Sequence, residues 1–151
     1  MTDAATGVLL LSHAAATLGM LGVIWFVQVV HYPLMASVGT EEFAAYEQAH
    51  ARQTTFVVAP LMLVELATGI ALAFGVAGGG AARWWIGLAL IALIWISTFA
   101  LQVPQHARLA SGFDAEAHAR LVATNWIRTV LWTARAGIVL WSLAGSWGNA
   151  D

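Results

Sequence analysis

The last long apolar run of the sequence, Leu121–Leu143, is interrupted by polar residues at regular intervals. Two arginines and an asparagine are among them, and the set recurs at spacings of three and four residues, which places its members on one face of a helix. An arginine near the middle of a membrane-spanning helix costs from about 3 to more than about 10 kcal/mol unless it faces a partner or water. We therefore expect this face to point into a polar interior. It consists of Asn125, Arg128, Thr129, Trp132 and Arg135.

Guanidinium groups beside amide side chains can hold an anion, a carboxylate or a quinone-like oxygen in a dry cavity. Earlier apolar runs supply such amides at Gln28 and Gln102, which are the candidate cofactor-binding residues. A histidine or Glu65 nearby could take a proton from a bound acidic carbon or phenol. This chemistry predicts a membrane-embedded oxidoreductase that acts on a lipophilic, oxygen-rich substrate. Its candidate catalytic residues are Glu65, Asn125, Arg128 and Arg135.

Three histidines at or near the ends of apolar runs are candidate metal ligands: His31, His50 and His106. Imidazoles from different helices near a carboxylate can bind a transition metal, and two opposed imidazoles can bind haem. The sequence contains no compact ligand motif such as His-Glu-x-x-His. A metal or haem site therefore depends on how the helices assemble. The sequence does not identify the cofactor, and both a transition metal and haem stay open.

Two other functions stay open beside the enzyme. The chain could be a non-catalytic haem- or metal-binding membrane protein, such as an electron carrier. It could also be a structural subunit of a larger membrane complex, in which the polar stripe only holds the helices together. Glu65 would then simply pair with Arg128 or Arg135.

The composition is that of a membrane protein. The chain has 151 residues, of which 60% are hydrophobic and 9% charged, and its mean hydropathy is +0.78; a soluble domain carries roughly 25% charged residues. All six cations are arginines and the formal net charge is −2, so no basic surface is available for nucleic acid. Cysteine is absent, which excludes disulfides and thiolate ligands. The expected partners are the lipid bilayer and a lipophilic small molecule, with a homo-oligomer left open.

Four apolar runs are long enough to cross a bilayer core, which needs about 20 residues. They predict an all-α fold, a single membrane domain over residues 1–151 built as a bundle of four transmembrane helices. The first run lacks the leading charges of a cleaved signal peptide and should stay as a membrane anchor. A glycine turn, Gly78–Gly80, should join the second run to the third. The predicted spans are 7–30, 56–76, 84–103 and 121–143.

Four spans would put both termini on one side of the membrane and the two histidine-bearing connectors on the other. The connector side has three arginines near span ends, Arg52, Arg108 and Arg120, whereas the terminal side has Arg83. The positive-inside rule then predicts cytoplasmic connectors.

The two halves of the chain resemble each other. Gln28-Val29, His31 and Met35-Ala36-Ser37 return as Gln102-Val103, His106 and Leu109-Ala110-Ser111. A repeated unit of two spans, as in many membrane folds, would bring equivalent residues together in pairs. The repeat suggests that the fold arose by tandem duplication of a two-helix hairpin. It predicts that His31 lies beside His106 and that His50 faces His118.

The second half also resembles a known family. The segment Asn125-Trp126-Ile127-Arg128-Thr129, followed by Arg135 and preceded by a proline just after the third span, is similar to the anthrone-oxygenase-like family of small four-span membrane proteins. The likeness covers Thr98–Trp141. Where the family commonly shows Pro-x-Asn, this chain has Pro104-Gln105-His106. The resemblance implies oxygen chemistry on a polycyclic phenol, with Asn125, Arg128 and His106 at the positions to watch.

Overall fold

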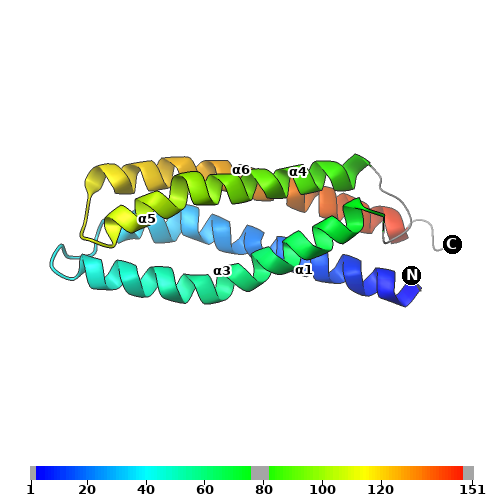
Figure 1. Cartoon of the computed structure of the whole chain (residues 1–151), viewed down its shortest axis with the longest axis horizontal. Coiled ribbons are helices and arrows are strands. Elements are labelled where there is room, and N and C mark those ends of the chain that lie inside the picture. Colours follow the sequence, from blue (N-terminus) through cyan, green and yellow to red (C-terminus); the bar gives the residue numbers. More distant parts are fainter. Residues whose placement is uncertain (1–2, 76–81, 148–151) are drawn as a thin grey trace.

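The computed structural model describes residues 3–75 and 82–147, and within these ranges the chain is helical with short turns and no strand. The helices form four long rods that lie side by side (Figure 1). The all-α prediction is therefore confirmed. The rods are α1 Asp3–Phe26 continued by η1 Val27–His31 and α2 Tyr32–Met35; α3 Phe43–Ala73; α4 Ala82–Ser97 continued by η2 Thr98–Gln102 and α5 Val103–Leu109; and α6 Ala115–Trp147.

Three of these rods are long and apolar enough to cross a membrane, counted over the described residues: Ala4–Met35, Phe43–Ala73 and Ala82–Leu109. Each contains one of the predicted spans or most of it. The fourth rod, α6, is long enough but falls outside this group, because its arginine stripe lowers its hydropathy. The predicted turn at Gly78–Gly80 lies outside the described residues.

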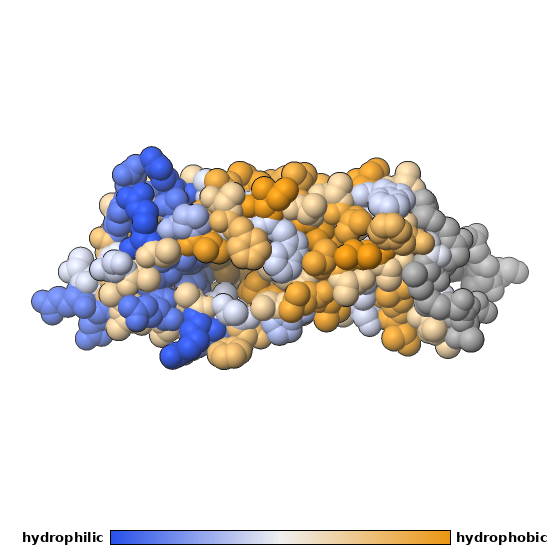
Figure 2. All heavy atoms as spheres, in the orientation of Figure 1, coloured by the Kyte–Doolittle hydropathy of each residue, from blue (hydrophilic) through white to orange (hydrophobic). Residues whose placement is uncertain are grey.

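The start of α1 and the end of α6 lie at one end of the bundle, and the α2–α3 and α5–α6 connectors lie at the other (Figure 1). The axis of α3 changes direction near its middle, in the part that contains Pro60 (Figure 1). Figure 2 shows hydrophilic residues gathered at the connector end and a mainly hydrophobic surface over the middle of the bundle.

Buried apolar side chains form three clusters along the length of the bundle. One, at the connector end, joins Tyr32, Phe43 and Leu121 with their neighbours, and another packs Trp84 against Leu72 at the opposite end. The cluster between them draws on all four rods. It consists of Met20, Ile24, Met62, Ile94 and Trp132.

The first and third rods share an unusual local feature, a π-helical turn followed by proline. The N–H of Tyr32 bonds to the carbonyl of Val27, and the N–H of Val103 bonds to the carbonyl of Thr98, five residues back in both cases. Each donor directly precedes a proline, Pro33 or Pro104. Because proline cannot donate a backbone hydrogen bond and crowds the preceding turn, a wider turn before it relieves the clash.

The two halves differ after these turns, which changes the pairing expected from the repeat. His31 is the last residue of η1, whereas His106 lies within α5, after η2 has ended, so the two histidines do not occupy equivalent positions. The observed contact joins His31 to His50 instead. His118 donates from Nε2 to the backbone carbonyl of Tyr32 at 2.7 Å rather than facing His50.

Candidate functional site

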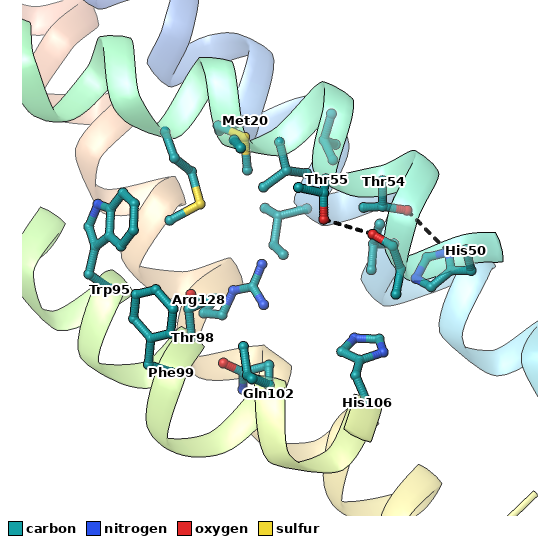
Figure 3. Close-up of a pocket in the computed structure, with 18 of the residues that line it drawn as sticks. Met20, His50, Thr54, Thr55, Trp95, Thr98, Phe99, Gln102, His106 and Arg128 are labelled. Carbon is teal, nitrogen blue, oxygen red and sulfur yellow. Dashed lines mark hydrogen bonds between the residues drawn. The ribbon is translucent and has the colours of Figure 1, made fainter. Parts of the chain in front are cut away.

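A cavity of about 370 Å³ lies among the four rods, in the half of the bundle nearest the connectors. This volume falls within the range of roughly 300–1,000 Å³ that is typical of small-molecule sites. His50 and His106 lie at one end of it, and Met20 and Trp95 lie at the other (Figure 3). Most of its remaining wall is apolar, as in ligand sites with a few orienting polar groups. The other polar side chains that line it are Tyr32, Thr54, Thr55, Thr98, Gln102 and Arg128.

A chain of three side chains runs from the cavity wall into the protein interior. The Tyr32 hydroxyl lies 3.0 Å from His106 Nε2, and His106 Nδ1 lies 2.5 Å from Glu47 Oε1. The Glu47 side chain is fully buried, and its Oε2 atom has no hydrogen-bond partner within residues 3–75 and 82–147. A carboxylate can only accept, so Nδ1 of His106 donates to Glu47 and, in a neutral ring, Nε2 accepts from Tyr32. A buried carboxylate thus orients an imidazole whose second nitrogen faces a cavity-lining hydroxyl.

A pair of hydrogen-bonded imidazoles, His31 and His50, lies at the same cavity, and His50 lines it. His31 Nε2 lies 2.9 Å from His50 Nδ1, and the Thr54 hydroxyl contacts the same nitrogen at 3.1 Å. The rings of His31 and His50 are stacked, with centroids 4.4 Å apart, and Tyr46 stacks against both. His50 and His106 face each other with ring centroids 5.6 Å apart. Both imidazoles that line the cavity are therefore held by specific partners.

Arg128 extends from α6 toward the middle of the cavity (Figure 3). Its side chain is only 8% exposed, it interacts with the Tyr32 hydroxyl, and its guanidinium carbon lies 5.4 Å from the centre of the Trp132 ring. Among the described residues, Nε has no hydrogen-bond partner and no carboxylate forms an ion pair with this arginine. Within the described residues, the cavity therefore contains a buried cation that has no ion-pair partner.

The amide side chains predicted as cofactor-binding residues connect helices. Gln28 accepts from Asn125 Nδ2 at 2.8 Å and donates to the Val122 carbonyl at 3.2 Å. Gln102 accepts from Ser97 and donates to Thr124. Gln102 also lines the cavity, whereas Gln28 and Asn125 do not. The side-chain carbonyl of Asn125 has no partner in the described part of the chain.

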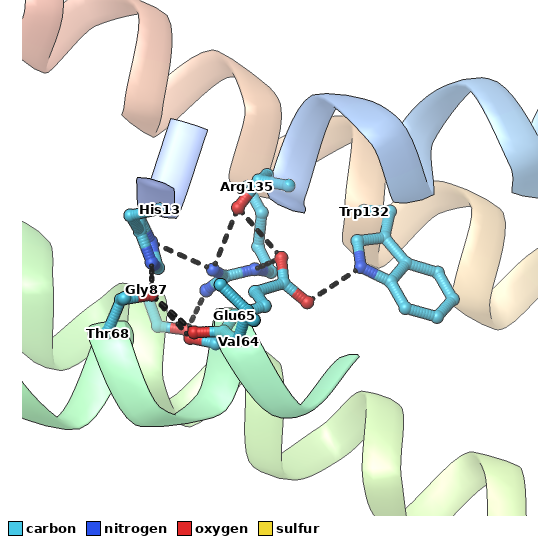
Figure 4. Close-up of polar contacts among 8 residues, drawn as sticks. His13, Val64, Glu65, Thr68, Gly87, Trp132 and Arg135 are labelled. Atoms are coloured by element: carbon cyan, nitrogen blue, oxygen red, sulfur yellow. Dashed lines mark hydrogen bonds and ion pairs between the residues drawn. The ribbon is translucent and has the colours of Figure 1, made fainter. Parts of the chain in front are cut away.

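Glu65 and Arg135 lie in a separate buried cluster that spans all four rods (Figure 4). Arg135 donates to Glu65 from Nε, to the backbone carbonyl of Gly87 from Nη1, and contacts His13 and Thr17 from Nη2. The second carboxylate oxygen of Glu65 accepts from Trp132 Nε1 at 3.0 Å, and His13 Nδ1 contacts the Thr68 hydroxyl at 2.7 Å. We call these residues the Glu65 cluster: His13, Thr17, Glu65, Thr68, Gly87, Trp132 and Arg135.

The prediction that the membrane-depth charges point inward is confirmed for Glu65, Arg128 and Arg135, which are all buried. The structure divides the candidate residues into groups instead of gathering them in one chamber. His50, His106, Gln102 and Arg128 line the cavity, and His31 contacts it through His50. Glu65 and Arg135 pair with each other, as the structural alternative for Glu65 predicts. Trp132 contacts both groups, because its Nε1 donates to Glu65 and its ring lies against the Arg128 guanidinium.

The candidate metal ligands His31, His50 and His106 lie close together in the described structure. No group of three or more His, Asp or Glu side chains in the described ranges is arranged to hold a metal ion. Both nitrogens of His106 are used by Tyr32 and Glu47, and His31 and His50 are bonded to each other.

Two site residues, Tyr32 and Glu47, are absent from the sequence-based candidates. Glu47 stands three residues before His50 on the same helix, so the two share a face. That spacing is the signal that could have identified Glu47. Tyr32 follows the π-turn, where the helical period shifts, and no regular period predicts that it faces inward.

No protein-family model matches this chain, and neither a curated protein nor a solved structure matches it. The function is therefore inferred from the site itself.

Proposed function

We propose that all four rods cross the membrane. The burial pattern of α6 supports a fourth span, because the helix buries its polar stripe and exposes large apolar side chains on the opposite side. Such a helix has the polarity of a bundle helix in lipid, where polar residues face the interior. The shared π-turns and prolines also support the duplication of a two-helix hairpin. The exposed apolar residues of α6 are Trp126, Ile127, Val130, Leu140 and Trp141.

The positions of the arginines favour cytoplasmic connectors, with both termini on the opposite side. Arg52 is exposed, and Arg108 and Arg120 have side chains that are 44% and 60% exposed. They can therefore contribute to the positive-inside bias.

Within this bundle we propose a membrane oxidoreductase that takes a lipophilic, oxygen-bearing substrate into the cavity and begins its oxidation by removing a proton. The observation that carries this proposal is the chain from Tyr32 through His106 to Glu47 at the cavity wall. A proton that leaves the substrate is taken up by the Tyr32 oxygen as the Tyr32 proton moves to His106 Nε2. The resulting imidazolium is stabilised by the Glu47 carboxylate, as in other oriented His–carboxylate pairs. A second molecule, such as oxygen or a quinone, accepts the electrons.

The experiment measures the proton step and the redox step on the same protein in lipid nanodiscs. A tetralone-type ketone in deuterium oxide reports proton abstraction as deuterium incorporation, and a lipophilic hydroquinone reports oxidation as oxygen uptake. Removal of a general base typically costs about 10²–10⁴-fold in rate. We expect His106→Gln to lose both activities to that extent and Glu47→Gln to lose a smaller part, while the exposed Glu116→Gln matches the wild type.

If wild type and His106→Gln exchange deuterium no faster than empty nanodiscs, the acid–base role is wrong. Deuterium exchange without hydroquinone oxidation, with either oxygen or an added quinone as the acceptor, would leave a proton-transfer enzyme and exclude the oxidoreductase.

A haem- or metal-binding protein is the second candidate, favoured by the close approach of the imidazoles of His31, His50 and His106. A metal on His31 and His50 requires their mutual hydrogen bond to open. Elemental analysis and an absorption spectrum of the purified protein test this function, and a colourless, metal-free preparation excludes it.

The anthrone-oxygenase-like resemblance also fits oxidation of a lipophilic phenol. Two of the positions it singles out, His106 and Arg128, line the cavity, and the third, Asn125, bonds to Gln28.

A further inference from the structure

The two buried arginines of α6 have different environments. Arg135 is 1% exposed and has an ion pair with Glu65 together with three further polar contacts. Arg128 is 8% exposed, and its guanidinium interacts with a phenol hydroxyl and with the face of an indole ring. The nearby carboxylate of Glu47 is bonded to His106 instead. Seven residues apart on one helix, Arg135 has a counter-charge in the described structure and Arg128 has none.

A buried cation without a counter-charge is costly, because it gives up hydration and gains little Coulomb energy in return. The guanidinium carries five donors in a planar fork, and Tyr32 and Trp132 occupy only part of it. Nε has no partner among the described residues, and the side chain faces the cavity (Figure 3). The site is therefore built to accept an anion from outside the chain.

We propose that Arg128 binds the oxyanion head of the substrate, and that the substrate is a lipophilic acid whose head carries two coplanar oxygens, such as a carboxylate or a hydroxyquinone-type enolate. Such heads match the planar fork with two parallel hydrogen bonds. This inference rests on the proposed substrate cavity and specifies the substrate class. It does not depend on the redox step.

The cavity fits a molecule of this kind. Its volume of about 370 Å³ accommodates roughly a dozen groups of water or methylene size, at about 30 Å³ each. With the head at Arg128, the body of the ligand extends along Met62, Trp95 and Phe99, which form the apolar wall. A flat bicyclic acid therefore has the right size and polarity.

The experiment compares 6-bromo-2-naphthoic acid with its methyl ester in the full-length protein in nanodiscs. Bromine quenches nearby tryptophan fluorescence, and the part of the quenching that is lost in Trp95→Phe reports binding in the cavity. The ester has the same body without the negative charge. Each affinity is measured for wild type, Arg128→Gln, Arg128→Lys and Arg120→Gln, an exposed arginine of the same helix that serves as the matched control.

We expect the wild type to prefer the acid beyond its partition into empty nanodiscs. Loss of one partner of a buried charge pair weakens binding substantially, so Arg128→Gln should lower acid affinity by roughly thirtyfold or more and ester affinity by less than about threefold. Arg128→Lys keeps the charge but loses the fork, so it should recover part of the acid preference. Arg120→Gln should behave as wild type.

The inference is wrong if acid and ester bind the wild type equally, or if Arg128→Gln weakens both to the same degree. Ester binding and circular dichroism show whether each variant is folded. If Arg128→Gln does not fold, the ratio of acid affinity to ester affinity in the wild type decides by itself whether the inference holds. If neither probe quenches Trp95, the cavity is no binding site for such molecules, and the proposed function fails with it.

Discussion

The Glu65 carboxylate and the Arg135 guanidinium lie 2.8 Å apart inside the bundle, with side chains 2% and 1% exposed. Partners from every rod surround them: His13 and Thr17 from α1, Thr68 from α3, Gly87 from α4 and Trp132 from α6. The backbone carbonyl of Gly87 accepts from Arg135 Nη1, which ties α4 to the ion pair. The ion pair and its partners therefore link all four rods.

Breaking this pair from one side should unfold the protein more readily than removing both charges. Arg135→Met leaves an uncompensated buried carboxylate, at a cost of about 3–5 kcal/mol. The double variant Glu65→Gln with Arg135→Met removes that charge and should recover part of the loss. Reversible unfolding in mixed detergent micelles measures the free energy of unfolding of the wild type, the single variants and the double variant. Equal losses in the single and double variants would show that the charges are not coupled.

Single-cysteine labelling can test the fourth span, because the natural chain contains no cysteine. We expect Ser37→Cys and Ser111→Cys, at the two connectors, to react from one side of the membrane, and Ala82→Cys and Ala144→Cys to react from the other. All four positions are exposed. Impermeant maleimide applied to intact and permeabilised cells gives the readout. If Ser111→Cys and Ala144→Cys react from the same side, α6 does not cross.

Filling the cavity should abolish ligand binding without harming the fold. Ala59 lines the cavity from α3, so Ala59→Phe places a ring in the apolar wall. Both naphthyl probes should then lose their quenching of Trp95. Stability should be unchanged or higher, because filling a cavity commonly adds about 0.5–2 kcal/mol. The matched control is Ala67→Phe, an exposed position on the same helix outside the cavity. Retained binding in Ala59→Phe would place the ligand elsewhere.

The start of α6 should give the protein an acid-sensitive contribution to stability. Asp114 accepts backbone hydrogen bonds from Ala117 and Glu116 and pairs with Arg108. The Ala117 bond and then Arg108 hold the pKa of Asp114 below its ordinary value of 3.8. The unfolded chain thus binds the proton more readily. The stabilisation is present above pH 3.8 and is lost as the pH falls from there through the lower folded pKa.

Thermal unfolding in detergent as a function of pH measures this contribution. Asp114→Asn keeps an acceptor for the helix N-terminus but cannot titrate, so its curve should fall less steeply in acid than that of the wild type. Glu41→Gln, at an exposed connector position, is the control. Identical acid limbs for the wild type and Asp114→Asn would contradict the role of Asp114.

Much of the architecture follows from the sequence, because hydropathy and helical period are local properties. The three most apolar rods and the inward face of α6 could be predicted from spacing alone. The π-turns could not, since Pro33 and Pro104 predict a helix boundary or a kink equally well. The repeat stays a prediction, and the pairing it suggested for His31 is not the observed one: His31 is the last residue of η1, whereas His106 lies within α5.

The site was less predictable because it depends on which inward-facing residues meet. Glu65, Arg128 and Arg135 all face inward, but periodicity alone does not show that Glu65 pairs with Arg135 and leaves Arg128 to the cavity. Glu47 precedes the predicted second span, 56–76, yet it lies fully buried within the continuous α3. Pairing between rods is set by their relative rotation and height, which a single sequence does not encode locally.

The two π-turns make the cavity end of the bundle sensitive to chain length. Each wide turn contains one residue more than a regular helical turn of the same rod would need, and Tyr32 and His106 both come after such a turn. Deleting a single residue from either turn would restore the ordinary winding and rotate everything beyond it by about 100°. The phenol or the imidazole would then swing away from its partners while the rod itself stayed intact. In-frame loss of one codon here should therefore leave a folded but inactive membrane protein.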